Sequence, residues 1–265
     1  DIVEGLLYAA GLPNASNTIY QGSIPIKVVN MSLGSTGGSC GSTYQNVIND
    51  VYDRGITIVS SSGNEAQEAP GFYGYPASCN NVISVAATDY LRNRAYYSTY
   101  NDQVDIAAPG GDLTADLSAD GYADGILAFD TNEDLSFLQG TSMASPHAAG
   151  ILGLIKYYYE EVAKPFQTNT SLPTVLKYTQ VDKMLRANLL TNDVNKEARD
   201  NDPTARPGWD EHLGYGIIDL EKSLKSINAF NSGYFTSFDN LPYYEGPSLV
   251  ALDAASSYEG TFTIT

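Results

Sequence analysis

Residues 26–59 read IKVVNMSLGSTGGSCGSTYQNVINDVYDRGITIV, and this stretch decides the fold class. It opens with a short apolar run rich in β-branched residues, 26–31, which predicts a strand buried on both faces. Apolar and aromatic residues between Tyr44 and Tyr52 then recur at helical spacing. A second apolar run at 56–59 predicts another buried strand. A strand, a helix and a strand in succession predict a parallel α/β unit.

The same alternation continues on both sides of this unit. Residues 2–10 have helical periodicity, and residues 81–87 and 104–107 form two further apolar runs of strand length. The predicted fold class is therefore α/β, a mostly parallel twisted sheet with helices on both faces. Ligands of such sheets bind beyond the carboxyl ends of the strands, so we expect the functional loops there.

A long helix is predicted at 142–158, where apolar residues lie nearly all round, as in a helix buried at the centre of a domain. Pro146 falls in its first turn, where the missing N–H has no helical partner in any case. Two surface helices are predicted at about 181–190 and 220–227, and the polar stretch between them predicts a loop.

The composition sets the broad class. With 43% hydrophobic residues, the 265-residue chain is globular. After residue 229 the pattern changes to aromatic segments spaced by Gly and Pro, so we expect a main domain at 1–229 and a C-terminal extension or further β module at 230–265. The net charge of −17 disfavours nucleic acid and anionic membranes as partners. No run approaches the roughly 18 apolar residues of a membrane span.

The two cysteines, Cys40 and Cys79, leave two interpretations open: two buried thiols or a disulfide. Both lie in polar, turn-rich segments rather than in the apolar segments where a free buried cysteine usually lies, which favours the disulfide. Such a bridge would stabilise the fold by roughly 3–4 kcal/mol in the loop-entropy model. It would also indicate an oxidising compartment.

The segment GTSMASPH at 140–147 carries the strongest chemical signal. A glycine turn leads directly into the first turn of the long helix and holds the Ser142 hydroxyl at its N-terminus. Free backbone N–H groups there would stabilise a neighbouring oxyanion. Taken alone, these residues leave two interpretations: Ser142 caps the helix, or it is a nucleophile.

The longer stretch GTSMASPHAAG at 140–150 resembles the nucleophile motif of the subtilisin-like serine proteases. Further segments resemble that family in the same order along the chain, namely NMSLG at 30–34, SSSGNE at 60–65, YPA at 75–77, VAAT at 85–88, DIAAPGG at 105–111 and GYGIID at 214–219. The resemblance spans residues 1 to about 229 and implies a secreted endopeptidase that acts on extended polypeptides.

The resemblance assigns roles to individual residues. Ser142 would attack the scissile carbonyl and form an acyl-enzyme, and Asn64 would donate its side-chain amide to the oxyanion. A cis Tyr75–Pro76 bond is also implied. The expected substrate-binding residues form a strand that pairs with the peptide and a pocket with a glycine floor for a large apolar or aromatic side chain: Ser32, Leu33, Gly34, Ser61, Ser62, Gly63 and Gly74.

A serine hydroxyl needs an adjacent base, and the family takes its His and Asp from upstream motifs that do not occur in this sequence. His147 lies about 140° around the helix from Ser142, and nothing favours His212. We therefore expect that an N-terminal piece of the same protease supplies the base, and that this chain alone is inactive. An inert fragment or a peptide-binding scaffold is the alternative.

Calcium is the one cofactor that the resemblance implies, in a structural role. The alternating oxygen ligands Asp130, Asn132 and Asp134 form the candidate site, although the segment lacks the Gly and the distal Glu of an EF-hand. Four aspartates that recur at every fourth position from Asp112 to Asp124 form a second acidic segment, and Asp200-Asn201-Asp202 a third. A solvated acidic loop is the alternative interpretation of each.

Overall fold

The computed structural model describes residues 1–36, 40–129, 131–167, 169–192 and 208–241. Its main sheet has the strand order β1-β3-β5-β6-β10-β9, in which every neighbouring pair is parallel except β10 and β9. The strands are β1 (Val28–Met31), β3 (Thr57–Ser61), β5 (Val82–Thr88), β6 (Ile106–Pro109), β10 (Ile217–Ile218) and β9 (Thr191–Asn192). The predicted fold class, a mostly parallel α/β sheet, is confirmed.

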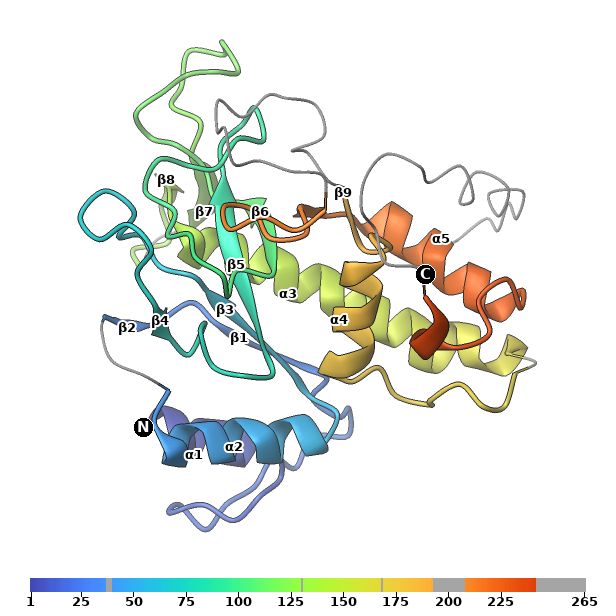
Figure 1. Cartoon of the computed structure of the whole chain (residues 1–265). Helices are drawn as coiled ribbons and strands as arrows, with labels where there is room; N and C mark the ends of the chain where they lie inside the picture. Colours follow the sequence, from blue (N-terminus) through green and yellow to red (C-terminus); the bar gives the residue numbers. More distant parts are fainter. Residues whose placement is uncertain (37–39, 130, 168, 193–207, 242–265) are drawn as a thin grey trace.

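Helices cover both faces of this sheet (Figure 1). On one face lie α1 (Ile2–Ala9) and α2 (Ser42–Asp53), and on the other α3 (Thr141–Tyr157), flanked by α4 (Tyr178–Arg186) and α5 (Leu220–Asn231). Successive strand residues point to opposite faces. Ile58 and Val82 accordingly pack with α1 and α2, whereas Val59 and Ile83 pack with α3.

A two-stranded hairpin was not predicted from the sequence. It consists of β7 (Ile126–Phe129) and β8 (Leu135–Leu138), which pair antiparallel and lead directly into the start of α3. Leu127 lies opposite Phe137, and Phe129 opposite Leu135, and all four side chains are exposed. All four residues of β7 are apolar and β8 has only Ser136 as a polar residue, so the hairpin lacks the apolar–polar alternation that marks a half-buried strand. A short antiparallel pair, β2 (Ser35–Thr36) with β4 (Gly74–Tyr75), was also not predicted.

The prediction that the long helix is buried all round is wrong for one stripe of α3. Ala144, Ala148, Leu152 and Ile155 are at most 1% exposed. Leu154 and Tyr157, by contrast, are 53% and 57% exposed. An apolar side chain favours burial, but it becomes buried only where another segment packs on it. No described segment covers this stripe of α3.

The C-terminal end of α3 is tied to the domain by a buried lysine. Lys156 is fully buried, and its Nζ donates to the carbonyl oxygens of Gly55, at 3.0 Å, and of Leu176. Glu160 lies 3.7 Å from the same Nζ and also pairs with Lys27. Beyond Lys156 the helix continues as a π-helical turn (Tyr158–Ala163) and a 3₁₀ turn (Lys164–Phe166).

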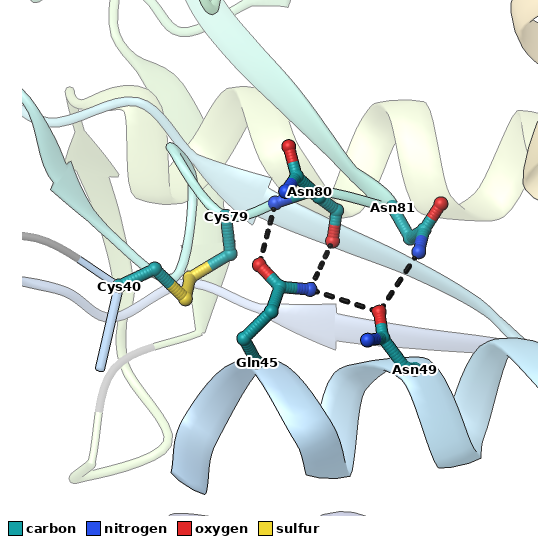
Figure 2. The surroundings of a disulfide bond; sticks show 6 residues. All are labelled: Cys40, Gln45, Asn49, Cys79, Asn80 and Asn81. Carbon is teal, nitrogen blue, oxygen red and sulfur yellow. Dashed lines mark hydrogen bonds between the residues drawn. A yellow bond between two sulfur atoms is a disulfide. The ribbon is translucent and has the colours of Figure 1, made fainter. Parts of the chain in front are cut away.

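Cys40 and Cys79 form a disulfide, as their polar surroundings predicted. Figure 2 shows that α2 is hydrogen-bonded to the same loop next to the bridge. The Gln45 side-chain amide accepts a hydrogen bond from Asn80 N at 2.9 Å and donates to Asn80 O at 3.0 Å, while Asn49 accepts one from Asn81. The bridge and these bonds together fix α2 to the start of β5.

The described part of the predicted extension belongs to the packing of the main domain. Phe230 and Phe238 are buried and stack with a centroid distance of 4.4 Å, and Phe235 packs against the same cluster. A short 3₁₀ turn, Phe238–Asn240, completes this segment. Residues 242–265 lie outside the described part of the chain, so the boundary at 229/230 stays a prediction.

Candidate active site

The predicted substrate-binding residues converge at the carboxyl edge of the sheet. The loops after β1 and β3, strand β4 and the first turn of α3 enclose a pocket of about 200 Å³. It is lined by Leu33, Gly34, Ser35, Ser61, Ser62, Gly63, Asn64, Glu65, Phe72, Gly74, Tyr75, Thr141 and Ser142. All predicted catalytic and substrate-binding residues are in this set except Ser32, whose Oγ donates to the Ser142 carbonyl at 2.8 Å. The Tyr75–Pro76 bond is cis, as the resemblance implied.

Thr141, which the sequence analysis did not single out, holds Asn64 in place. The Asn64 Oδ1 accepts hydrogen bonds from Thr141 N at 2.9 Å and from Thr141 Oγ1 at 3.0 Å. The Thr141 hydroxyl in turn accepts one from Gly63 N at 3.2 Å. Because Asn64 Oδ1 accepts these two hydrogen bonds, the side-chain amide of Asn64 is held in one orientation. No described residue accepts a hydrogen bond from Asn64 Nδ2.

Two N–H donors therefore face one small space at the start of α3. Gly140, the N-cap of the helix, has a φ of +146°, a conformation that favours glycine. A methyl group added to Gly140 would lie 3.6 Å from both Asn64 Nδ2 and Ser142 N. The Ser142 N–H lies in the first turn of α3, where backbone N–H groups have no acceptor within the helix. This pair of donors is the arrangement that binds a developing oxyanion.

A buried tyrosine, also absent from the sequence-based prediction, anchors the Gly140 turn. Tyr97 Oη accepts a hydrogen bond from Gly140 N at 2.9 Å and donates one to the Gly111 carbonyl at 2.8 Å. Burial raises the pKa of Tyr97, so its hydroxyl stays neutral and keeps both roles. No local sequence signal marks Tyr97, because its partners lie far along the chain.

The Ser142 hydroxyl makes no hydrogen bond with any described residue. His147 is exposed, and its Nδ1 lies 2.8 Å from the Met143 carbonyl one helical turn back. His212 packs edge-on against Tyr100, with ring centroids 4.6 Å apart. Neither histidine lines the pocket that contains Ser142. Within the described residues, Ser142 therefore has no base beside it.

A second pocket, of about 640 Å³, lies at the opposite ends of the strands and is lined by Asp105, Arg186 and Trp209 among others. Burial raises the pKa of Asp105 to about 7. Of the predicted site residues, only Cys79 contributes to it.

The candidate calcium ligands are only partly described, because Asp130 lies outside the described residues. The described ranges contain no group of three or more His, Cys, Asp or Glu side chains that could hold a metal ion. In the second acidic segment, the carboxylates of Asp112, Asp116 and Asp124 accept hydrogen bonds from backbone N–H groups of their own loop. Asp200-Asn201-Asp202 is outside the described part, and calcium binding stays a prediction.

Comparison with known proteins agrees with this geometry. Residues 7–216 match the sequence model of a peptidase family, the subtilase family. The chain belongs to the subtilase family. An extracellular protease of Xanthomonas campestris pv. campestris is 37% identical over 179 residues, and thermitase of Thermoactinomyces vulgaris is 36% identical over 154 residues. A solved structure of proteases from Pseudoalteromonas arctica superposes with a TM-score of 0.60 at 27% identity over 85% of this chain.

These matches cover only part of each relative. The alignments span 68% of this chain but 28% of the Xanthomonas protease, and 58% of this chain but 44% of thermitase. The Pseudoalteromonas chain is covered to 58%. In the part of the subtilase chain that the structure describes, no helix has the length and apolar character needed to cross a membrane.

Proposed function

We propose that this chain is the nucleophile-bearing part of a secreted serine endopeptidase that hydrolyses peptide bonds through an acyl-enzyme on Ser142. The observation that carries the proposal is the convergence of two N–H donors, Asn64 Nδ2 and Ser142 N, at the helix end that bears Ser142. Attack by the Ser142 hydroxyl moves negative charge to the carbonyl oxygen, and these donors would stabilise that charge more strongly than the neutral substrate.

The proton of Ser142 Oγ has to leave as the bond to the carbonyl carbon forms. A histidine oriented by an aspartate performs this task in proteases of this kind and later returns the proton to the leaving amine. Since His147 and His212 lie elsewhere, the proposal assigns both residues to an upstream segment of the same protein. Family membership supports this assignment.

The substrate is proposed to be an extended polypeptide. Ser32, Leu33 and Gly34 would pair with its backbone as an added strand, and the residue before the scissile bond would enter the pocket of about 200 Å³. Gly74 contributes no side chain to that pocket, which leaves room for a large apolar or aromatic group. Secretion is supported by the Cys40–Cys79 disulfide and by the extracellular protease among the relatives.

Labelling with a fluorophosphonate, read out by intact mass and peptide mapping, tests the proposal. The probe modifies a serine only when a base activates it. We expect no label on the chain alone, and one label on Ser142 after the upstream segment is added as a separate polypeptide. The Ser142→Ala variant is the control and should take no label under either condition.

Peptide turnover by the complemented protein gives a quantitative readout. Asn64→Ala should lower kcat by about 10²–10³-fold, a magnitude measured in a relative of the family. A complemented protein that binds peptides but neither takes the label nor cleaves them would instead be an inert peptide-binding scaffold, and the proposal would be wrong.

A further inference from the structure

The β7–β8 hairpin presents one apolar face to the surroundings. Leu127 lies opposite Phe137 and Phe129 opposite Leu135, so these two pairs project from the same face of the hairpin. The four side chains are between 40% and 73% exposed. Tyr122 is also exposed and stacks on Phe137 with a centroid distance of 6.1 Å. A contiguous patch of large apolar side chains on a folded protein marks an interaction surface.

The loop that precedes the hairpin places four aspartates at the border of this patch. The loop projects from the molecule at the top of Figure 1. Asp112 and Asp124 pair as an isolated β-bridge, and Asp124 lies two residues before β7. Between them, the Asp120 carboxylate accepts a hydrogen bond from Tyr122 N at 2.9 Å, and the Asp116 carboxylate accepts one from Asp120 N at 3.2 Å. The four carboxylates are thus held on the same loop as the Tyr122 ring.

The negative charge of this border is not neutralised by the chain. Residues 95–155 contain nine Asp or Glu residues and no Lys or Arg. Asp112, Asp116, Asp120 and Asp124 form no ion pair with any described residue. Their hydrogen bonds to backbone N–H groups stabilise the charged form without cancelling its charge. A surface with an apolar, aromatic centre and a negative border complements a partner that is both apolar and cationic.

The surface also leads directly to the nucleophile. Gln139 connects the hairpin to its neighbours, because its Oε1 accepts a hydrogen bond from Leu113 N at 2.6 Å and its Nε2 donates to Tyr96 Oη at 2.8 Å. Phe137 lies five residues before Ser142, so the two are at most about 18 Å apart. An extended polypeptide held at Ser142 therefore reaches the patch with roughly five of its residues.

We infer that the apolar face of the hairpin and its acidic border form a second binding surface for the substrate, which selects polypeptides that contain a cationic, apolar segment. This hairpin surface consists of Leu127, Phe129, Leu135, Phe137 and Tyr122 with Asp112, Asp116, Asp120 and Asp124. The inference rests on the proposed function, because it takes the occupant to be part of the polypeptide that is cleaved at Ser142. A second copy of this chain is disfavoured as the occupant, since each copy has a net charge of −17 and like charges repel.

The test measures peptide binding by the 265-residue chain, with Ser142→Ala in every sample to exclude cleavage. The probe is a short fluorescent peptide of alternating leucine and lysine, and fluorescence anisotropy gives its affinity. Two further probes have glutamine or glutamate in place of every lysine. They separate the contribution of positive charge from that of apolar contact.

Each variant of the hairpin surface has a matched control elsewhere in the chain. Phe129→Ser removes the most exposed side chain of the apolar face, at 73%. Its control is Phe166→Ser, because Phe166 is 74% exposed and lies in the 3₁₀ turn beyond α3. Asp120→Asn removes one charge and keeps an oxygen that accepts the hydrogen bond from Tyr122 N. Its control is Asp53→Asn, at the end of α2, where the side chain is 73% exposed.

We expect the lysine peptide to bind more tightly than the glutamine peptide, with an affinity that falls as the salt concentration rises, and the glutamate peptide not to bind. Phe129→Ser should weaken binding of the lysine peptide at least about tenfold, and Asp120→Asn about two- to threefold, whereas the two controls should bind as the parent chain does.

Three results would overturn the inference: equal affinity of the Phe129→Ser and Phe166→Ser variants, equal affinity for the lysine and glutamine peptides, or self-association of the chain that Phe129→Ser abolishes. The last result would assign the hairpin surface to a second copy. Failure of the proposed function is recognised separately by fluorophosphonate labelling of the complemented protein. Selective binding of the lysine peptide without a label on Ser142 would keep the binding surface and refute the proposed function, whereas a label without selective binding would refute this inference alone.

Discussion

The two sides of α3 have nearly the same chemistry and opposite surroundings. One side, with Ala148, Leu152 and Ile155, is buried against the sheet, and the other, with Leu154 and Tyr157, is more than half exposed. Both sides are apolar, and they are separated by only two or three positions in the sequence.

The difference shows that an apolar helix face indicates a need for a partner without indicating where the partner comes from. On the buried side the partners are strands β1, β3, β5 and β6 of the same chain. On the exposed side no described segment fulfils this role. The predictions below compare the two sides of α3 directly. Each one distinguishes a helix face that the chain itself covers from a helix face that the chain leaves exposed.

The largest effect is expected from truncating one leucine on each side. Leu152→Ala should lower the free energy of unfolding by about 2–5 kcal/mol, because it opens a cavity in a packed core. Leu154→Ala should change it by less than about 0.5–1 kcal/mol in the chain alone, because the side chain is 53% exposed. Urea denaturation of both variants measures the difference.

Similar losses for the two variants would contradict this comparison. They would mean that Leu154 is covered in solution by this chain itself or by a second copy. Repeating the Leu154→Ala measurement over a range of protein concentrations separates those cases, since only self-association makes the unfolding midpoint depend on concentration.

The next effect concerns Lys156, the one charged residue on the buried side of α3. Burial lowers the pKa of Lys156 to about 8, an effect that Glu160 partly offsets and Lys27 reinforces. Between this value and the usual 10.5, the unfolded chain binds more protons than the folded chain, so stability rises with pH through that window. We expect a gain on the order of 1–2 kcal/mol between about pH 8 and pH 9.5.

Replacement of the lysine isolates its contribution. The Lys156→Met variant has no titratable group at this position. The difference in free energy of unfolding between wild type and variant should therefore change by about 1–2 kcal/mol between about pH 8 and pH 9.5, as expected from the lowered pKa of Lys156. A pH-independent difference would mean that the buried ammonium keeps its ordinary pKa. Denaturation at several pH values in one mixed buffer provides the comparison.

Sequence periodicity predicted the parts of the fold in which a segment and its partner are both present in the chain. The runs at 26–31, 56–59 and 81–87 each overlap a strand of the main sheet, because buried parallel strands have continuous β-branched segments. The nucleophile pocket was also predicted, since its residues follow the strands as the α/β architecture requires. Only family resemblance, however, assigned roles to Ser142 and Asn64.

The features that could not be predicted depend on contacts between residues far apart in the sequence, or on an exposure that the amino-acid pattern does not reveal. Thr141 holds Asn64 from 77 positions away, and Tyr97 anchors Gly140 from 43 positions away. The hairpin β7–β8 exposes four large apolar side chains, and its short segments have no apolar–polar alternation that would predict which face is exposed. The exposed stripe of α3 belongs to the same category, because its amino acids alone cannot distinguish it from the buried side.

The smallest predicted effect is a gain in stability, and it tests the exposed side of α3 most directly. Gly150→Ala should raise the free energy of unfolding of the chain alone by up to about 1 kcal/mol, because alanine favours the helix and its methyl group meets nothing within 4 Å. Gly5→Ala, at an equally open helical position on the other face of the sheet, should give a similar gain. A loss for Gly150→Ala beside a gain for Gly5→Ala would show that the chain already fills the space at Gly150. In that case the two sides of α3 would not differ in their need for a partner, and Gly150 would be small to suit packing within the chain.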